Sequence, residues 1–212
     1  MAIGPLGVRS RQSALRPFAL LVALLVTGCG GGSLEPLAPG DVILAFGDSL
    51  TEGVGASADT SYPARLAALS GHTVVNAGVS GETTAEGLER LPAVLDETDP
   101  GLMILLLGGN DILRNGSPTE AKRNLSRMIE MALERGVQVL LVGVPEKSLF
   151  SRSAPFYQEL AEQHGVVLMD GMVASLLKKP AYKSDQVHLN TAGYREMAGR
   201  IHARLAEEGA LR

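Results

Sequence analysis

The stretch FGDSLTEGVG, residues 46–55, follows directly on the apolar run VILA at residues 42–45. Gly47 allows a sharp backbone turn that a residue with a side chain would resist. Asp48 and Ser49 are residue types that form turns and cap helices. The stretch therefore predicts a strand that turns into a helix. Taken alone, a turn without chemistry and a nucleophilic serine placed where a strand meets a helix are equally good interpretations.

Apolar runs of the same kind recur along the chain, and their starting positions are 29–35 residues apart. This spacing matches strand-plus-helix units of about 30 residues. The runs are continuous rather than alternating, which is typical of parallel strands covered on both faces. We therefore expect an α/β domain over residues 41–212, a three-layer sandwich around a parallel sheet. The five runs are VILAF from Val42, TVVN from Thr73, LMILLL from Leu102, VQVLLVGV from Val137 and VVLM from Val166.

Two of the expected helices carry clear signals. SPTE at residues 117–120 is a capping box with proline in the first turn, and Gly136 marks the end of that helix. The last helix ends near Gly209. One apolar face is expected on each helix, formed by Ala121, Leu125, Met128, Ile129, Ala132 and Leu133 in the first and by Tyr194, Met197, Ala198, Ile201 and Leu205 in the last.

Polar and glycine residues follow the first three expected strands. Ser49 comes just after the first strand, Gly78 after the second and Asn110 after the third. Ligands of such sheets bind beyond the carboxyl ends of the strands, so these residues should share one edge. Gly78 could bring a backbone N–H, and Asn110 a side-chain amide, to the anion formed when a serine attacks a carbonyl. A tight turn at Gly78 and a helix cap or stabilised loop at Asn110 are equally consistent alternatives.

A serine nucleophile needs a base, and His188 is the candidate. It stands in SDQVHLN before the last helix, with Asp185 three residues earlier. A carboxylate at this spacing can orient the imidazole and leave its other nitrogen to the serine. A helix-entry loop capped by Asn190 explains the same residues without catalysis. The other histidines, His72, His164 and His202, have positions that indicate structural or solvated roles.

Four blocks occur in order at the ends of the expected elements, namely GDSL at 47–50, NAGVSGETT at 76–84, GGND at 108–111 and DQVH at 185–188. With them the chain resembles the SGNH hydrolases, or GDSL esterases, and is most similar to their bacterial thioesterase/lysophospholipase/arylesterase subgroup. The resemblance implies a flavodoxin-like five-stranded sheet, a Ser49–His188–Asp185 triad, and oxyanion donors from Ser49 N–H, Gly78 N–H and Asn110. It implies no metal or organic cofactor.

Two departures from the family pattern concern the shape of the histidine loop. Gln186 stands where the family often has glycine, and Leu189 stands where it often has proline. These changes put the substrate range in doubt rather than the triad.

The expected substrates are small acyl esters and thioesters, with lysophospholipids possible. Ile112, Leu113, Leu149 and Phe150 could line an acyl groove, or they could simply pack the loops. The chain has no tryptophan and only four phenylalanines and four tyrosines, which weighs against a sugar-stacking platform. A deacetylase of envelope or extracellular polysaccharide is the alternative enzyme. A non-catalytic lipoprotein that binds lipid or glycan is the alternative outside enzymes.

The N-terminal part predicts export. Residues 1–28 contain three arginines, no acid and an apolar run too short to span a bilayer, which is typical of a signal peptide. VTGC ends at Cys29, which resembles the lipidation site of bacterial lipoproteins; an ordinary secretory signal with an incidental cysteine is the alternative. Residues 29–40 are expected to form a lipidated cysteine and a flexible tether.

The composition excludes further classes of partner and of covalent cross-link. Removal of residues 1–28 would shift the net charge from −4 to −7, which argues against a nucleic-acid partner. One cysteine allows no internal disulfide. We expect a monomer that is held in the cell envelope, on the periplasmic face or the outer membrane, by its lipid anchor.

Overall fold

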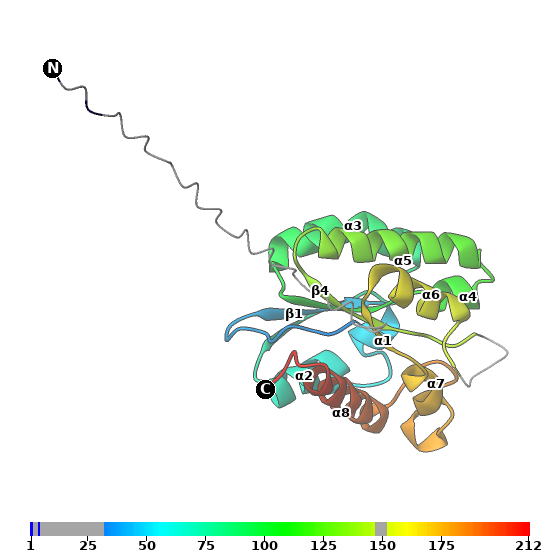
Figure 1. Cartoon of the computed structure of the whole chain (residues 1–212). Coiled ribbons are helices and arrows are strands. Elements are labelled where there is room, and N and C mark those ends of the chain that lie inside the picture. The colour runs from blue at the N-terminus through cyan, green and yellow to red at the C-terminus, as the bar shows by residue number, and fades with distance from the viewer. Residues whose placement is uncertain (2–3, 5–31, 147–151) are drawn as a thin grey trace.

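The structure, a computed structural model, describes residues 1, 4, 32–146 and 152–212 (Figure 1). Five strands form one parallel sheet in the order β2-β1-β3-β4-β5. This order is that of the flavodoxin-like fold. The expected sheet is therefore confirmed, and each strand begins within one residue of its predicted start. The strands are β1 Val42–Gly47, β2 Thr73–Gly78, β3 Leu102–Leu106, β4 Gln138–Val142 and β5 Val167–Met169.

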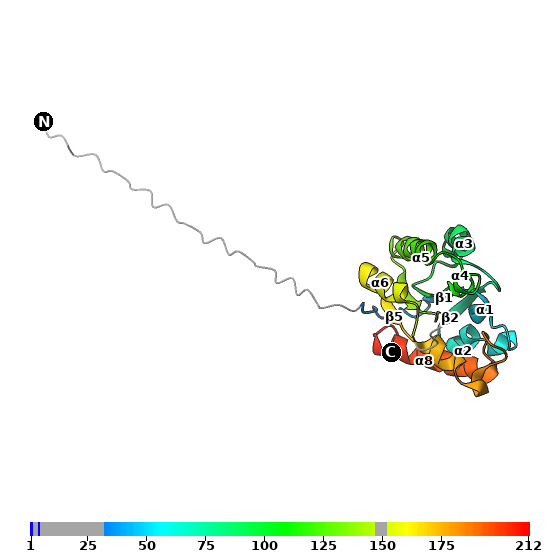
Figure 2. The same ribbon diagram turned by 90° about the vertical axis from the view of Figure 1, so that its right-hand side faces the viewer.

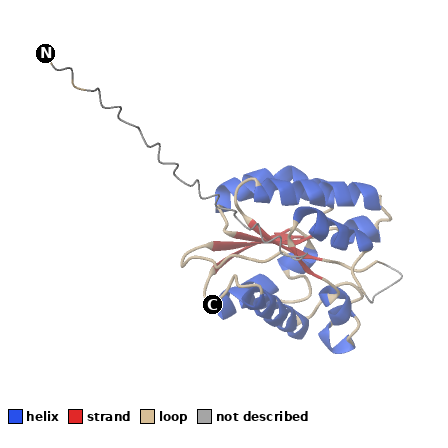
Figure 3. Ribbon diagram, viewed as in Figure 1, coloured by secondary structure: helices blue, strands red, loops and turns tan. Residues whose placement is uncertain are grey.

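Helices cover both faces of the sheet (Figures 1 and 3). On one face lie α3 Thr84–Thr98, α5 Pro118–Leu133 and α6 Pro155–His164, and on the other lie α2 Tyr62–Ser70, α7 Met172–Leu177 and α8 Thr191–Glu207. This double cover explains why the central strands are apolar throughout rather than alternating. Short elements complete the chain, namely α1 Ser49–Glu52, α4 Gly109–Leu113 and the 3₁₀ helices η1 Ala58–Thr60 and η2 Pro180–Tyr182.

Helix α5 has the serine half of its predicted capping box, and its buried face differs from the prediction by one residue. Ser117 Oγ accepts the N–H of Glu120 at 3.3 Å, and Pro118 occupies the first turn. Leu133 was expected on the buried face, yet it is 40% exposed. The reason is the helical rotation of about 100° per residue, which carries Leu133 away from the face of its neighbour Ala132. Asn124 is buried instead and donates to Thr84 Oγ1 at 3.1 Å.

The segment before β1 is part of the domain, so the expectation of a flexible tether up to Gly40 is wrong for residues 34–37. Leu34 belongs to the hydrophobic core, and its N–H donates to Glu208 O at 3.2 Å. Glu35 exchanges two hydrogen bonds with the side chain of Gln138, the first residue of β4. The segment therefore lies at the amino edge of the sheet, on the side of the C-terminus (Figure 2).

The opposite, carboxyl edge of the sheet holds the residues of interest. In this strand order the connection from β1 runs to β2 at one side, and the chain then returns across β1 to β3 at the other. The crevice between the ends of β1 and β3 is the usual ligand site of such sheets. Ser49 follows β1 and Asn110 follows β3, so they stand on either side of this crevice.

We predict that Leu34→Ala destabilises the protein by about 2–5 kcal/mol, because it leaves a cavity where a core leucine packed. Leu69→Ala is the control, since Leu69 is 52% exposed and its loss should change stability by less than about 0.5 kcal/mol. Urea unfolding of the chain from Gly32 onward measures both values. Equal effects of the two substitutions would show that residues 34–37 are not part of the folded core.

Candidate active site

Ser49 is presented by the tight connection between β1 and α1. Asp48 caps α1, with its Oδ1 accepting the N–H of Leu50 at 3.0 Å. Gly47 is required here because a Cβ at this position would lie 2.1 Å from the carbonyl oxygen of Leu106 on β3. The sharp turn predicted from the sequence therefore exists, and it leaves Ser49 half-buried in the wall of a pocket.

A chain of hydrogen bonds links Ser49 to residues far along the sequence. Ser49 Oγ lies 3.0 Å from His188 Nε2, and His188 Nδ1 lies 2.7 Å from Asp185 Oδ2. A carboxylate can only accept from the ring, so Nδ1 carries the proton and Nε2 is left to accept from the serine hydroxyl. The structure thus joins the three predicted side chains in one chain of hydrogen bonds, with His188 in the middle.

The histidine loop is held in place by the start of α8. Asn190 caps this helix through Gly193 N–H at 3.0 Å, and its amide donates to Ala181 O and Lys183 O. The Asn190 helix cap, which would explain this loop without catalysis, is therefore present together with the contact between His188 and Ser49. It fixes the backbone immediately after His188.

Asp185 stays ionised although it takes part in this network. Desolvation acts to raise the pKa of Asp185, but the N–H groups of Val187 and His188 and the His188 ring outweigh it, and the pKa lies below its ordinary value. The two backbone bonds, at 2.8 and 2.9 Å, also fix the carboxylate toward the ring. A group with these properties can stabilise a positive imidazole.

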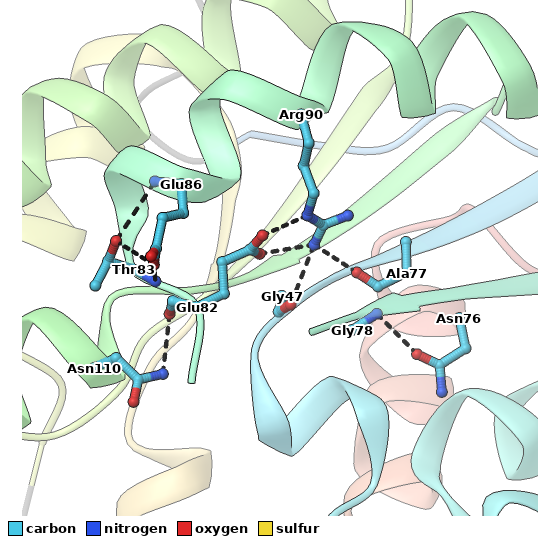
Figure 4. Close-up of polar contacts among 9 residues, drawn as sticks. All are labelled: Gly47, Asn76, Ala77, Gly78, Glu82, Thr83, Glu86, Arg90 and Asn110. Carbon is cyan, nitrogen blue, oxygen red and sulfur yellow. Dashed lines mark hydrogen bonds and ion pairs between the residues drawn. The ribbon is translucent and has the colours of Figure 1, made fainter. Parts of the chain in front are cut away.

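Gly78 does not reach the site, and the prediction that it supplies an oxyanion donor is wrong. Its N–H already donates to Asn76 Oδ1 at 3.0 Å (Figure 4). A Cβ at Gly78 would lie 2.0 Å from the Glu52 nitrogen, so glycine is needed there to let α1 pack on β2. This close approach accounts for the glycine without any catalytic role.

Gly81, which the sequence reasoning missed, lines the pocket instead. It is the second glycine of NAGVSGETT and has a φ of +80°. Its carbonyl accepts from Arg114 Nη2 at 2.8 Å. Among the residues that the structure describes, the N–H groups of Gly81 and Ser49 donate to no protein acceptor. Both are therefore free to meet a ligand.

Asn110 lines the same pocket from the start of α4. Its Nδ2 donates to the carbonyl of Glu82 at 2.9 Å (Figure 4). An amide nitrogen carries two protons, so this bond fixes the orientation of the side chain and leaves one N–H for a ligand.

The pocket has a volume of about 470 Å³ and joins the polar groups to an apolar wall. Ile112 and Leu113 lie in this wall as predicted, whereas Leu149 and Phe150 fall outside the described residues. The sequence reasoning did not identify the residues of α7 that face them, because a buried residue and a pocket residue have the same apolar character. The remaining apolar lining residues are Leu50, Val144, Pro145, Val173, Leu177 and Val187.

Two other histidines have structural contacts. His72 Nδ1 lies 3.1 Å from Asp41 O, and His164 Nε2 lies 2.8 Å from Ser126 Oγ, which links α6 to α5. Within the described part of the chain, no group of three or more His, Cys, Asp or Glu residues is arranged to hold a metal ion.

Asp48 is a buried carboxyl directly beneath the serine. Desolvation raises the pKa of Asp48 to about 7, against the lowering effect of Leu50 N–H and of nearby His188, while Glu82 adds to the rise. The group therefore changes its charge close to neutral pH, and it lines the same pocket as Ser49.

Comparison with known proteins identifies related chains. The sequence profile of the GDSL-like Lipase/Acylhydrolase family matches residues 45–196. The arylesterase of Vibrio mimicus is 37% identical over 153 residues, which cover 68% of this chain and 76% of that protein. Thioesterase 1/protease 1/lysophospholipase L1 of Escherichia coli is 32% identical over 161 residues, which cover 72% of this chain and 77% of that protein.

Solved structures agree with these relatives. The crystal structure of TesA matches with a TM-score of 0.69 and 30% identity, covering 79% of this chain and 99% of that chain. AlinE4, an SGNH-hydrolase family esterase, matches with a TM-score of 0.63 and 35% identity, covering 81% of this chain and 97% of that chain. The similarity therefore extends over nearly the whole folded domain.

We predict that Asp48→Asn changes how stability depends on pH. The folded pKa of about 7 lies above the ordinary value of 3.8, so the folded state binds more protons than the unfolded state between these values. Stability from this group is therefore present below about pH 4 and is lost as the pH rises towards 7. Asp48→Asn, which keeps the acceptor for Leu50 N–H, should remove that loss and be relatively more stable at pH 8 than at pH 5.

Urea unfolding at the two pH values measures this difference, with the exposed Asp59→Asn as the control. If wild type and Asp48→Asn show the same change between pH 5 and pH 8, the carboxyl of Asp48 is not the group that links folding to protons.

Proposed function

Because the chain belongs to the GDSL-like lipase/acylhydrolase family and is an ester-hydrolysing enzyme, we propose that Ser49, His188 and Asp185 are its catalytic triad. The observation that carries the proposal is the hydrogen-bonded chain from Ser49 Oγ through both ring nitrogens of His188 to Asp185. These contacts join residues 139 positions apart in sequence, at the lip of a pocket. A structural loop needs no such alignment of a hydroxyl, a base and a carboxylate.

The reaction has two stages. Ser49 Oγ attacks the acyl carbonyl carbon while His188 Nε2 accepts the hydroxyl proton, and Asp185 stabilises the positive imidazole. The tetrahedral intermediate collapses, and His188 returns the proton to the leaving alcohol or thiol. A water molecule, deprotonated by the same nitrogen, then attacks the acyl-serine ester and releases the carboxylic acid together with free Ser49.

The negative oxygen of each intermediate needs donors that are already in place. We assign this role to Ser49 N–H, Gly81 N–H and the remaining N–H of Asn110. Support comes from their common position in the pocket wall and from the absence, among the described residues, of protein acceptors for the two backbone groups. Gly81 replaces Gly78 in this assignment.

The substrate class follows from the pocket and the relatives. An apolar wall beside the serine suits an acyl chain, and the relatives are named arylesterase, esterase and thioesterase/lysophospholipase. We assign acyl esters and thioesters to this site, with lysophospholipids as larger candidates. The apolar wall favours these substrates over acetylated polysaccharide, and the aligned triad favours an enzyme over a binding lipoprotein.

We predict that Ser49→Ala abolishes hydrolysis of p-nitrophenyl esters, with kcat lowered by several orders of magnitude, because among the described residues no other hydroxyl is paired with His188. Asn110→Ala should lower kcat by about 10²–10³-fold, as expected for the loss of one oxyanion donor. Steady-state kinetics over a series of acyl chain lengths measure both effects and the preferred acyl length.

Ser57→Ala is the control for these kinetics, since Ser57 is exposed and its Oγ contacts Thr60 rather than the pocket. Full activity of folded Ser49→Ala would exclude the proposed triad. Inactivity of the wild type on every p-nitrophenyl ester, together with activity on acetylated glycans, would support the deacetylase alternative.

We also propose that the protein is exported and anchored through a lipid on Cys29, with residues 1–28 as signal peptide. These residues, apart from Met1 and Gly4, lie outside the described part of the chain. Because Leu34 is packed in the core, at most about 18 Å of extended chain would separate it from Cys29. The lipid-bearing segment would join the domain at the amino edge of the sheet. The pocket, at the carboxyl edge, would then face away from the anchoring membrane. Within the described residues, no helix is long and apolar enough to cross a bilayer.

The anchor predicts a simple fractionation result. Wild type should sediment with membranes and incorporate labelled palmitate, whereas Cys29→Ser should do neither and remain active. Equal partition of the two proteins would exclude lipidation at Cys29 and favour the ordinary secretory signal.

A further inference from the structure

A charged pair on the side of α3 has a buried carboxylate and a partly exposed guanidinium, since the Arg90 side chain is 25% exposed. The Glu82 side chain is only 4% exposed, and Arg90 of α3 approaches it with Nε and Nη2 (Figure 4). The Nη2 contact to Glu82 Oε2 measures 2.7 Å. Two parallel contacts of this kind fix the relative orientation of guanidinium and carboxylate, because both groups are planar.

The same guanidinium also contacts the carboxyl ends of two strands, β1 and β2. Arg90 Nη2 donates to Ala77 O on β2 at 2.8 Å and lies 3.4 Å from Gly47 O on β1. The carbon of the guanidinium stacks 4.0 Å from the centre of the Phe46 ring. Gly47 is the residue from which the chain turns toward Asp48 and Ser49, so Arg90 touches the base of the nucleophile turn.

The carboxylate partner of Arg90 belongs to the loop of the proposed oxyanion hole. Glu82 directly follows Gly81, and its main-chain carbonyl holds the Asn110 amide at 2.9 Å. Val79 and Ser80, at the start of this loop, are exposed and contribute no buried packing. The position of the loop therefore depends on polar contacts. Among the polar side chains of the loop, the Glu82 carboxylate is the most deeply buried.

We propose that Arg90 and Glu82 are positioning residues that hold the oxyanion donors of Gly81 and Asn110 in register with Ser49. The inference rests on the proposed function of this site and deepens it. Burial of the Glu82 carboxylate costs desolvation, and a packed apolar pair could fill the same space. What an apolar pair could not supply is the fixed orientation of a carboxylate and two carbonyls around one planar cation. Lysine, a single point charge, could not supply it either.

The proposal makes a specific kinetic prediction. Misplacement of the donors by about 1 Å should lower kcat by about 10²-fold. KM should change little, because the donors act on the transition state rather than on the bound ester. A boronic acid, which forms a tetrahedral adduct with a catalytic serine, should lose affinity by the same factor as kcat. A merely stabilising pair would affect neither quantity below the melting temperature.

The experiment compares Arg90→Lys, Arg90→Met and the double variant Arg90→Met/Glu82→Gln. The double variant removes both charges and so avoids leaving one of them buried without a partner. Leu91→Ala is the matched control, because Leu91 is the neighbouring residue of α3, is fully buried and has no polar contact to the loop. It should lower the melting temperature while leaving kcat and boronate affinity unchanged.

The outcomes separate the inference from the proposed function. Parallel losses of kcat and boronate affinity in folded Arg90→Lys and in the double variant support the inference. Folded variants with wild-type kcat and boronate affinity overturn it, and so does failure of all three variants to fold, which would make the pair a fold determinant. Ser49→Ala is measured alongside, since full activity of that variant would overturn the proposed function instead.

Discussion

Parallel pairing of β1 with both β2 and β3 is the constraint on which the site depends. Because all three strands point the same way, the residues that follow them arrive at one edge of the sheet. Ser49, Gly81 and Asn110 reach the pocket by this route. His188 arrives by another, through the loop that precedes α8, and Asn190 fixes that loop at the helix start. The contact between Ser49 and His188 joins the loop after β1 to the loop before α8.

Two carboxyl groups, those of Asp48 and Glu82, are buried near this edge. Asp48 lies beneath the serine, and Glu82 with Arg90 lies behind the loop that carries Gly81. Each buried charge opposes folding unless it is paired or neutralised. The Glu82 carboxylate is paired, whereas Asp48 shifts its pKa towards neutrality. Such groups are concentrated where the backbone must be held in an orientation that apolar packing alone does not specify.

The sequence predicted the strands and the closeness of Asp185 to His188 because both depend on local patterns, whereas the pairing of His188 with Ser49, 139 positions away, was implied by the family resemblance. Continuous apolar runs indicate covered parallel strands, and Asp185 lies close enough to His188 in sequence for a loop to bring them together. The choice between Gly78 and Gly81 could not be made in this way. Gly78 ends β2 and Gly81 follows three residues later. In the structure the Gly78 N–H donates to Asn76 Oδ1, and α1 packs so closely on Gly78 that a Cβ would not fit. That contact is tertiary and leaves no signal in the motif.

Two further errors also come from tertiary contacts that the sequence does not reveal. The segment 34–37 has a composition typical of a tether, yet Glu35 meets Gln138 over 103 positions of sequence. No local pattern predicts so distant a contact. The apolar residues Val173 and Leu177 of α7 are indistinguishable from core residues until the pocket is seen. The prediction that Leu133 is buried was wrong for a simpler reason, because this residue lies one position beyond the buried face of its helix.

The most direct test of the central claim is covalent labelling with diethyl p-nitrophenyl phosphate, followed by peptide mass spectrometry. The account predicts one phosphoryl adduct per chain, on the peptide that contains Ser49, formed in step with loss of esterase activity. It also predicts that His188→Ala blocks the labelling, because Ser49 then lacks its base. An adduct on another residue, or loss of activity with Ser49 unmodified, would contradict the assignment of Ser49 as the nucleophile.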